Sequence, residues 1–483
     1  MTTTYSSVVK RYLRFAATLS IVFSVAMIIV NFNRYGTGWT PSSLAFAGTH
    51  LTLSLANLLL SYQIHQTGQP QSWHRPLGFI LMLSVLLGNP FNFISGMFVL
   101  LRKITSYQIY LIFSVLVDLT IIAVTSLNAL KPSLNPNFTT GLTLLCVSLL
   151  IHWGLALFSG KLNQLSGRVL YTIVGILTVT ALSGNLLSLF AAYLLYQHNT
   201  TPTNERRTSV LANISRHEVA VFGLYMIAFI LAMAVTSYLP FDYSYAIENN
   251  YSAILQTPNW TYPLGTDNFG RDVFSRLVFG GRISLVVGLL ATTAPLLIGG
   301  FLGSVAGYYS QHIDQTIMRL LDVLYAIPGI LLAITIVTAF GTSTQNLIIA
   351  LSVGGIPGYA RTMRASVIQV KQLEYIEAAH AVGVNDRKII LKHIIPNAAA
   401  PMIIRASLTV ATAVISTSSL SYLGLGVESH IPEWGNILRI GSDYLETHSF
   451  LAIYPGLAII ALVLSFNFLG DGLRDALDPK MNQ

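Results

Sequence analysis

The side chains that could take part in acid–base or proton chemistry are few and scattered through the 483 residues of this chain. Asp118, His50 and His152 lie in or near strongly apolar segments, where an ionisable group is costly and usually faces a partner or a cavity. Their spacing does not join them into a recognisable relay, so we expect structural roles, with proton coupling as the alternative. Because the sequence has no paired acids, metal-ligand cluster or nucleophile with a base at matching positions, it predicts no catalytic residue, metal site or bound cofactor.

The sequence also lacks a loop that could bind the phosphates of a nucleotide. Such a loop has the pattern Gly-x-x-x-x-Gly-Lys-Ser/Thr, in which backbone N–H groups and a lysine surround the phosphate. The nearest dipeptide, Gly160-Lys161, is followed by Leu162 and preceded by an apolar segment. We therefore predict that this chain is not an enzyme and does not hydrolyse ATP by itself.

The segment between residues 371 and 397 is polar, and its pattern predicts a helix, a break and a second helix. The first helix has an apolar stripe with the spacing i, i+3, i+4 and i+7, formed by Tyr375, Ala378, Ala379 and Val382. Gly383 then ends this helix, and Asn385 or Asp386 can cap the second one. The second helix has its own stripe, formed by Ile389, Ile390, His393 and Ile394, and Pro396 suits the first turn of the segment that follows.

Both stripes need an apolar surface against which they can be buried. The two alanines of the first stripe would let another backbone approach closely, which favours a partner protein. The alternative is that both stripes pack beneath the helices of the same chain.

The elements that position this loop must lie in a membrane. Hydrophobic residues make up 53% of the chain, charged residues make up 10%, and the mean hydropathy is +0.62. Soluble proteins have about 25% charged residues. At about 20 apolar residues for each spanning helix, twelve spans would occupy about half of the chain and leave no room for a large soluble domain. The lone cysteine, Cys146, excludes an intrachain disulfide.

We predict an all-α, polytopic bundle of about twelve transmembrane helices. Six predicted spans in the first part of the chain are joined by short polar turns: 12–32, 43–64, 77–101, 108–130, 138–158 and 169–196. Six more are separated by longer polar stretches: 218–238, 283–309, 322–340, 347–370, 397–424 and 451–470. No motif is recognisable in a second copy, so no internal repeat is expected.

The basic residues are expected to determine the topology, because they are scattered between apolar runs and form no stripe that could bind nucleic acid. Residues 1–200 contain ten Lys and Arg but one acid, whereas residues 201–483 contain seventeen Lys and Arg against eighteen acids. With the N-terminus inside, the predicted spans place eight basic residues of the first part inside: Lys10, Arg11, Arg14, Arg75, Lys131, Arg206, Arg207 and Arg216. Five would lie outside: Arg34, Arg102, Lys103, Lys161 and Arg168. Eight basic residues inside against five outside is a weak positive-inside bias.

The second part of the chain gives a clearer orientation. The stretch 361–393 contains six basic residues, whereas the stretch 425–450 contains only Arg439. The loop at 371–397 and both termini are therefore predicted to be cytoplasmic.

Four stretches resemble the dipeptide, oligopeptide and nickel permeases, a family of ABC-importer subunits. Glu377-Ala378-Ala379, Gly383 and Ile394-Ile395-Pro396-Asn397 match the EAA loop of bacterial ABC-importer permeases. The other stretches are Leu264-Gly-Thr-Asp-Asn-Phe-Gly-Arg-Asp272, Leu420-Ser-Tyr-Leu-Gly-Leu-Gly-Val427 with Trp434-Gly-Asn436, and Phe468-Leu-Gly-Asp-Gly-Leu-Arg-Asp-Ala-Leu-Asp-Pro479. The resemblance covers about residues 215–480. Residues 1–200 lie outside it, and the usual member of the family has only six spans.

The resemblance implies a transport subunit of the bacterial inner membrane with a type I ABC-importer core, most typically for peptides. In that family the EAA loop contains the coupling helix that docks in a groove on a cytoplasmic ATPase. This role is therefore expected for Glu377, Ala378, Ala379, Gly383, Pro396 and Asn397. The implied partners are a second permease, either a paralogue or a chain of the same kind, two ATPases that bind ATP and magnesium, and an extracellular substrate-binding protein.

The resemblance also divides the chain into an accessory six-helix module, residues 1–200, and a permease domain, residues 201–483. Hydroxyl side chains near one face of the span after Pro396 could line a translocation path, or could mediate ordinary helix packing. They are Thr409, Thr412, Ser416 and Ser419. The motifs are shared across dipeptide, oligopeptide and nickel transporters, so they do not specify the substrate.

Two outer regions have alternative interpretations. The polar and aromatic stretch 239–270 is predicted to face outside, as is the loop that contains Glu428, Glu433 and Trp434. Each could bind the substrate-binding protein or could anchor the chain at the membrane interface through Trp and Tyr side chains. The alternative for the chain as a whole is a twelve-span secondary transporter that is not driven by ATP. It would predict paired repeats and charged midplane residues.

Overall fold

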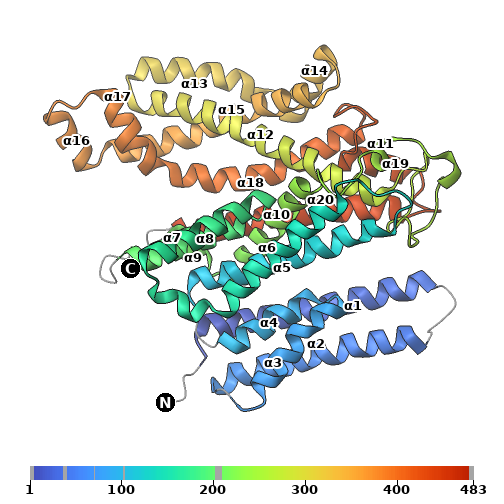
Figure 1. Cartoon of the computed structure of the whole chain (residues 1–483). Helices are drawn as coiled ribbons and strands as arrows, with labels where there is room; N and C mark the ends of the chain where they lie inside the picture. The colour runs from blue at the N-terminus through green and yellow to red at the C-terminus, as the bar shows by residue number, and fades with distance from the viewer. Residues whose placement is uncertain (1–4, 36–40, 70, 102–103, 202–208, 478–483) are drawn as a thin grey trace. The chain divides into compact units, whose positions relative to one another are not determined.

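The computed structural model describes residues 5–35, 41–69, 71–101, 104–201 and 209–477. Within these ranges the regular elements are helices (Figure 1). The only extended pairing among the described residues is an isolated bridge between Thr266 and Asp272. Eight described helices are long and apolar enough to cross a membrane, or nine if one bent pair forms a single span. The prediction of an all-α polytopic fold is confirmed, although the number of continuous spans is smaller than twelve.

The chain forms two compact units. Unit 1 comprises residues 1–130 and 136–221, and unit 2 comprises residues 131–135 and 222–483. The elements of unit 1 are α1 (Ser7–Tyr35), α2 (Pro41–Thr67), α3 (His74–Leu83), η1 (Ser84–Leu87), α4 (Pro90–Leu101), α5 (Ser106–Ser126), η2 (Leu127–Leu130), α6 (Phe138–Leu157), η3 (Ser159–Gln164), α7 (Gly167–Thr180), η4 (Ala181–Ser183), α8 (Leu186–Thr200) and α9 (Val210–Ile214).

Two segments that were predicted to be single spans, 77–101 and 169–196, are helical hairpins instead. The first divides into α3–η1 and α4, and the second into α7–η4 and α8, with the turns at Gly88 and Gly184. Both glycines have a left-handed backbone, with φ of 89° and 88° respectively. Each hairpin packs its two arms together. The longer arm of the first, His74–Leu87, extends only about 21 Å at 1.5 Å per residue, which is shorter than a hydrocarbon core of about 30 Å.

Unit 1 contains an internal repeat, which the sequence analysis did not find. The order of two long helices followed by a helical hairpin occurs once in α1–α4 and again in α5–α8. Each hairpin turns at the dipeptide Gly-Asn, at positions 88–89 and 184–185. Three polar positions on the long helices also correspond, each at a distance of 94 positions: Ser20 with Ser114, Ser24 with Asp118, and Ser54 with Ser148.

The corresponding polar residues meet at the tips of the two hairpins. The Asn89 amide donates to Ser20 Oγ at 3.0 Å and to Ser24 Oγ at 3.1 Å. The Asn185 amide donates to the Ser114 carbonyl at 3.0 Å and to Asp118 Oδ1 at 2.9 Å. Because these partners lie near the middle of the long helices, each hairpin reaches about half-way along its neighbours. Polar backbone at such a depth is tolerated where protein groups satisfy it.

Asp118 and His152 are not isolated, contrary to the sequence-based expectation. His152 Nδ1 lies 2.6 Å from Asp118 Oδ2, and both side chains are buried. His152 Nε2 also contacts Thr180 Oγ1 at 2.9 Å. Thr180 is the last residue of α7, which is the first arm of the second hairpin. The pair therefore links α5 and α6 to the second hairpin, which supports the structural interpretation over the relay. His50 is not at the equivalent position of the first repeat, but it also contacts a hairpin, since its Nε2 lies 2.7 Å from the Leu87 carbonyl.

Unit 2 contains the remaining elements, with the first residues of α10 in unit 1. They are α10 (Glu218–Thr236), α11 (Ser244–Ile247), η6 (Tyr251–Ala253), α12 (Val273–Tyr308), α13 (Gln311–Ala326), α14 (Gly329–Phe340), α15 (Thr344–Lys371), α16 (Glu374–Ala381), α17 (Asp386–Ile389), the π-helix η7 (Ile390–Ile394), α18 (Ile395–Tyr422), α19 (Trp434–Ser442) and α20 (Phe450–Leu477). The predicted span 322–340 is divided between α13 and α14, which bend by 82° at Ile327–Pro328. Proline removes a backbone donor and disfavours helix in the preceding residue.

The start of α12 is fixed by buried charged side chains. Asp272 caps the helix, accepting from the backbone N–H of Phe274 and Ser275. Its Oδ2 lies 2.7 Å from Nζ of Lys131, whose segment 131–135 belongs to unit 2 although it connects α5 to α6. Asp267 accepts from Arg271 Nε at 2.8 Å within the same turn. The stretch 264–272 therefore has a structural role in positioning α12.

Candidate coupling site

The loop at residues 371–397 has the predicted order of helix, break and helix. α16 ends at Ala381, and Gly383 follows with φ of +78°. A residue with a Cβ is strained in this left-handed region, which explains the glycine. Asn385 caps α17, because its side chain accepts from the Arg387 N–H at 3.0 Å. The chain continues through one π-helical turn directly into α18.

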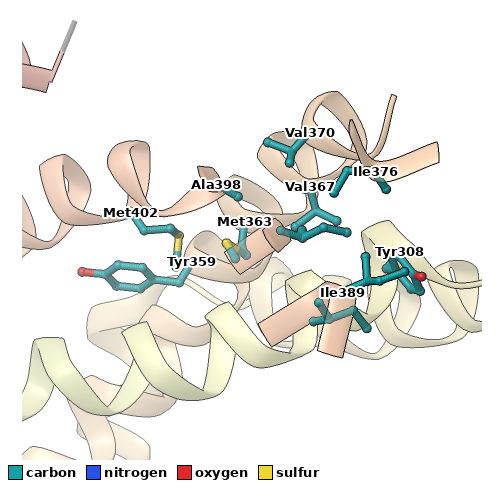
Figure 2. Packing of buried hydrophobic residues seen from close by; sticks show 11 residues of the cluster. Tyr308, Tyr359, Met363, Val367, Val370, Ile376, Ile389, Ala398 and Met402 are labelled. Carbon is teal, nitrogen blue, oxygen red and sulfur yellow. The ribbon is translucent and has the colours of Figure 1, made fainter. Parts of the chain in front are cut away.

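The isoleucines of the second predicted stripe are buried within unit 2, whereas its fourth member, His393, is half-buried and lies outside the cluster. Ile389, Ile390 and Ile394 lie in one apolar cluster with residues from α12, α15 and α18, as Figure 2 shows for Ile389. The other members are Tyr308, Tyr359, Met363, Val367, Val370, Ile376, Ala398 and Met402. The second helix therefore anchors the loop to the spanning helices.

The stripe of α16, by contrast, is open. Tyr375 is 42% exposed and Val382 is 83% exposed, and Ala378 is also exposed. Only Ala379 of this stripe contacts the cluster. The residue of α16 that packs inward is Ile376, which is 1% exposed and lies beside Val367 and Val370 in Figure 2. The inward face of α16 was not predicted, because a single isoleucine gives no periodic signal.

Tyr308 fixes α16 to the C-terminal end of α12. Its hydroxyl donates to Asp386 Oδ1 at 2.7 Å and lies 3.2 Å from His380 Nε2, and its ring stacks on the His380 ring. Its carbonyl accepts from Lys371 Nζ at 2.6 Å. One tyrosine thus contacts residues on both sides of Gly383. Its role was not predicted, because Tyr308 lies 75 positions before Gly383 and has no local motif.

Ion pairs connect α13 to α15 beside the same cluster. Arg364 donates from Nε and Nη2 to the two carboxylate oxygens of Asp314, each at 2.5 Å. Arg361 pairs with Asp322 at 2.5 Å and lies over the Tyr325 ring. The bidentate pair has the geometry that holds two helices in register. These ion pairs join α13 to α15, and the apolar cluster joins α15 to α12, α16 and α18.

The remaining predicted coupling residues lie at the solvent-facing side of the loop. Glu377 is exposed in the first turns of α16. Pro396 is exposed in the first turn of α18, and Asn397 donates from its amide to the His393 carbonyl at 2.5 Å. Their roles in coupling stay predictions.

The predicted pathway residues lie on the open side of α18. Thr412 is exposed, and Thr409, Ser416 and Ser419 are half-buried. Thr409 and Thr412 donate to carbonyls of their own helix, so neither hydroxyl depends on another helix for its partner. Ser419 also lines an apolar cavity of about 360 Å³ with Tyr422 and Leu438. Arg405 packs on α15, where its guanidinium donates to Thr362 Oγ1 at 3.0 Å.

Glu433 and Trp434, in the loop that was predicted to face outside, are buried, which corrects the expectation that they anchor or dock at the surface. Trp434 donates from its indole to the Leu277 carbonyl at 2.9 Å. Glu433 caps α19 by accepting from the N–H groups of Gly435 and Asn436. Burial raises the pKa of Glu433, and these hydrogen bonds oppose the rise. In the stretch 239–270, by contrast, Tyr251 and Trp260 remain mostly exposed.

The chain is similar to known transport permeases. Residues 299–483 match the family described as "Binding-protein-dependent transport system inner membrane component". The dipeptide transport system permease protein DppC of Alkalihalophilus pseudofirmus is 41% identical over 289 residues, which are 59% of this chain and 95% of that protein. The glutathione transport system permease protein GsiD of Pectobacterium atrosepticum is 40% identical over 270 residues, which are 56% of this chain and 89% of that protein.

Among solved structures, an inward-facing MetNI methionine ABC transporter has 21% sequence identity and a TM-score of 0.36, over 42% of this chain and 97% of that chain. The two permease relatives are matched over most of their own length, and the loop has the open helix and the buried helix described above. The chain therefore belongs to the binding-protein-dependent transport system inner membrane components, as a permease subunit of an ABC importer.

Proposed function

We propose that this chain is a permease subunit of a peptide importer and that α16 receives the motion of a cytoplasmic ATPase. The relatives named for dipeptide and glutathione transport support a peptide-type substrate. The proposed complex contains a second permease, two ATPase subunits that bind ATP and magnesium, and an extracellular substrate-binding protein. This chain contributes no ATPase site of its own.

The observation that carries the proposal is the contrast between the two faces of α16. Its inward face is fixed by Ile376 and by the contacts of Tyr308, whereas Tyr375, Ala378 and Val382 form an apolar surface with no cover from the described residues. An exposed apolar patch on a helix that is fixed to the spanning helices is suited to binding a protein partner. Closure of the ATPases would move α16 and shift the spanning helices between two states.

Reconstitution of the complex tests this function. The chain, its second permease and the two ATPases are purified together and placed in liposomes with the substrate-binding protein. We expect ATP hydrolysis that increases when a peptide-loaded binding protein is added, and uptake of that peptide. The chain purified alone should show no turnover. ATP hydrolysis by the isolated chain, or peptide uptake that needs no ATPase subunit, would contradict the proposal and favour a secondary transporter.

The hairpins change the proposed topology of unit 1. If α3–α4 and α7–α8 enter and leave on the cytoplasmic side, the unit crosses the membrane four times and both termini remain cytoplasmic. Eleven basic residues then lie inside: Lys10, Arg11, Arg14, Arg75, Arg102, Lys103, Lys161, Arg168, Arg206, Arg207 and Arg216. Only Arg34 and Lys131 lie outside. The positive-inside bias is thus eleven to two, against eight to five for six continuous spans, and this supports the re-entrant arrangement.

Cysteine labelling distinguishes the two topologies. Cys146 is replaced by serine, and single cysteines are introduced at Ser133 and at Ser166, which lie in the loops after α5 and before α7. The re-entrant topology predicts that a membrane-impermeant maleimide labels the Ser133→Cys variant from outside and the Ser166→Cys variant only after the membrane is opened. The reverse pattern would restore six continuous spans. Arg102, Lys103, Arg206 and Arg207 lie outside the described residues, so their positions in this count come from the sequence alone.

Residues 1–200 are proposed to be accessory to the transport cycle. The repeat and the Asp118–His152 pair are features that a secondary transporter would have, but the pair is buried and bonded to the helices around it. The Asp118–His152 pair is therefore better explained as a structural contact that fixes the second hairpin to α5 and α6.

Lys131 complicates the removal of this module. Loss of one partner from a buried ion pair costs about 3–5 kcal/mol, so a chain starting at residue 205 would leave the Asp272 carboxylate uncompensated. We therefore expect residues 205–483 to assemble better with Asp272→Asn than without it, and to retain peptide-stimulated ATPase activity and uptake. A truncated complex that assembles and binds ATP but moves no peptide would refute the accessory role.

A further inference from the structure

Unit 1 has a basic cavity of about 680 Å³ at the ends of several of its helices. The first turns of α1 and α5 open into it, and the end of α8 and the short helix α9 complete its walls. α1 and α5 are corresponding helices of the two repeats, so the cavity lies between equivalent helix starts. Its volume is within the range of small-molecule binding sites, about 300–1,000 Å³.

The charged groups that line the cavity are basic. Arg11 and Arg216 contribute guanidinium groups, and no Asp or Glu is among the described lining residues. Arg11 donates to the Arg216 carbonyl at 2.7 Å and lies 3.6 Å from Glu218, which compensates part of its charge. The Arg216 side chain is exposed, and none of the described ion pairs includes it. The first turns of α1 and α5 have no acidic residue, so their N-termini add partial positive charge.

The rest of the lining is amphipathic. Polar groups come from Ser7, Ser106, Gln197 and Ser209, whereas Val8, Ile104, Ile109, Leu194 and Ala212 form an apolar wall. A small, fully hydrated anion would gain nothing from such a wall. A molecule with a phosphate and attached acyl chains would use both parts of the lining.

We propose that this cavity binds the phosphate group of an anionic phospholipid from the cytoplasmic leaflet. The proposal rests on the topology given above, which places the starts of α1 and α5 at the cytoplasmic surface. Anionic lipids are concentrated in that leaflet, and basic cavities between helices at this level bind their headgroups. The lipid would join the two repeats at their open ends, where the hairpins enter.

Native mass spectrometry of the full importer complex tests the proposal, with phosphatidylglycerol and phosphatidylcholine as the two probes. We expect the complex to retain one phosphatidylglycerol molecule in preference to phosphatidylcholine. Arg11→Gln and Arg216→Gln should each weaken this retention about fivefold, because one basic residue near an anionic surface contributes about 1 kcal/mol. Arg168→Gln is the matched control, since Arg168 is exposed at the start of α7 but does not line the cavity.

A second variant keeps the test decisive if loss of an arginine prevents assembly. Ala212→Trp fills the cavity from its apolar wall and leaves both guanidinium groups in place, so it should also reduce retention of phosphatidylglycerol.

Inorganic phosphate is added in a parallel experiment and should not displace the lipid. Displacement by phosphate would assign the cavity to free phosphate and overturn the lipid proposal.

Equal retention of the two lipids, or unchanged retention in all three cavity variants, would also overturn the proposal. These outcomes are independent of the proposed function. A complex that imports peptide but shows no lipid preference would refute only the lipid site, whereas a complex that retains the lipid but never imports peptide would refute only the transport role.

Discussion

The two short helices of the loop at residues 371–397 are both amphipathic but have opposite surroundings. The stripe of α17 and the π-helical turn is buried among α12, α15 and α18, whereas the stripe of α16 is largely exposed. One helix therefore contributes to the stability of the permease, and the other has an exposed apolar surface that we propose binds a partner. The difference shows that an amphipathic pattern predicts that the apolar face will be buried. It does not predict whether the same chain or a partner protein buries it.

The largest effect on stability is expected at the buried stripe. Ile389 is fully buried, so Ile389→Ala should lower the free energy of unfolding by about 2–5 kcal/mol through lost burial and the cavity left behind. Val382→Ala is the matched control on the open stripe, and it should change stability by less than about 0.5 kcal/mol. Thermal unfolding of the purified complexes measures both. Equal losses from the two variants would remove the distinction between the stripes.

A smaller effect is expected at the break between the helices. Gly383 has φ of +78° and open space around its Cβ position, so Gly383→Val should cost about 1–2 kcal/mol through backbone strain alone. We expect the complex to assemble but to hydrolyse ATP without moving peptide, because α16 no longer keeps its angle to α17. Gly383→Asn is the control, since asparagine tolerates this conformation. Normal uptake by the valine variant would show that the orientation of α16 is not critical.

A smaller effect still is expected when Tyr308 loses its hydroxyl. Tyr308→Phe removes the hydrogen bonds to Asp386 and His380 but keeps the ring, at a cost of about 1 kcal/mol. Amide hydrogen exchange in α16 should then become about fivefold faster, because local opening is easier by that amount. Exchange in α18 should not change. Uniform acceleration across unit 2 would show that Tyr308 supports the whole unit and not α16 in particular.

Sequence reasoning succeeded where one local signal decided the structure. Gly383 and Asn385 ended and began helices as their conformational preferences required, and the stripe of Ile389, Ile390 and Ile394 packed as a unit. It failed for the hairpins of unit 1, because an apolar run does not reveal a turn whose polar groups are satisfied by other helices. The available signal was the dipeptide Gly-Asn, which occurs in two apolar runs at positions 88–89 and 184–185.

The candidate site was predicted only in part for a similar reason. The exposed residues of α16 were identified by their spacing, but Tyr308 and Ile376 hold the helix through contacts that depend on the tertiary structure. Glu433 and Trp434 looked like surface residues in a polar loop, yet both are buried because helix capping and one indole hydrogen bond satisfy their polar groups. Burial of such residues depends on which helices pack around the loop, and the local sequence does not predict that packing.

The central claim is that the open stripe of α16 binds the ATPase subunit, and photo-cross-linking tests it most directly. In a Cys146→Ser background, a benzophenone maleimide is attached to Val382→Cys or to Ile376→Cys within the reconstituted importer. Val382, the residue directly after α16, is 83% exposed, whereas Ile376 packs inward against the apolar cluster. We predict that the probe at position 382 forms a cross-link to the ATPase subunit, identified by mass spectrometry, and that the probe at position 376 does not. Cross-links from position 382 only to this chain or to lipid, in a complex that still imports peptide, would contradict the claim.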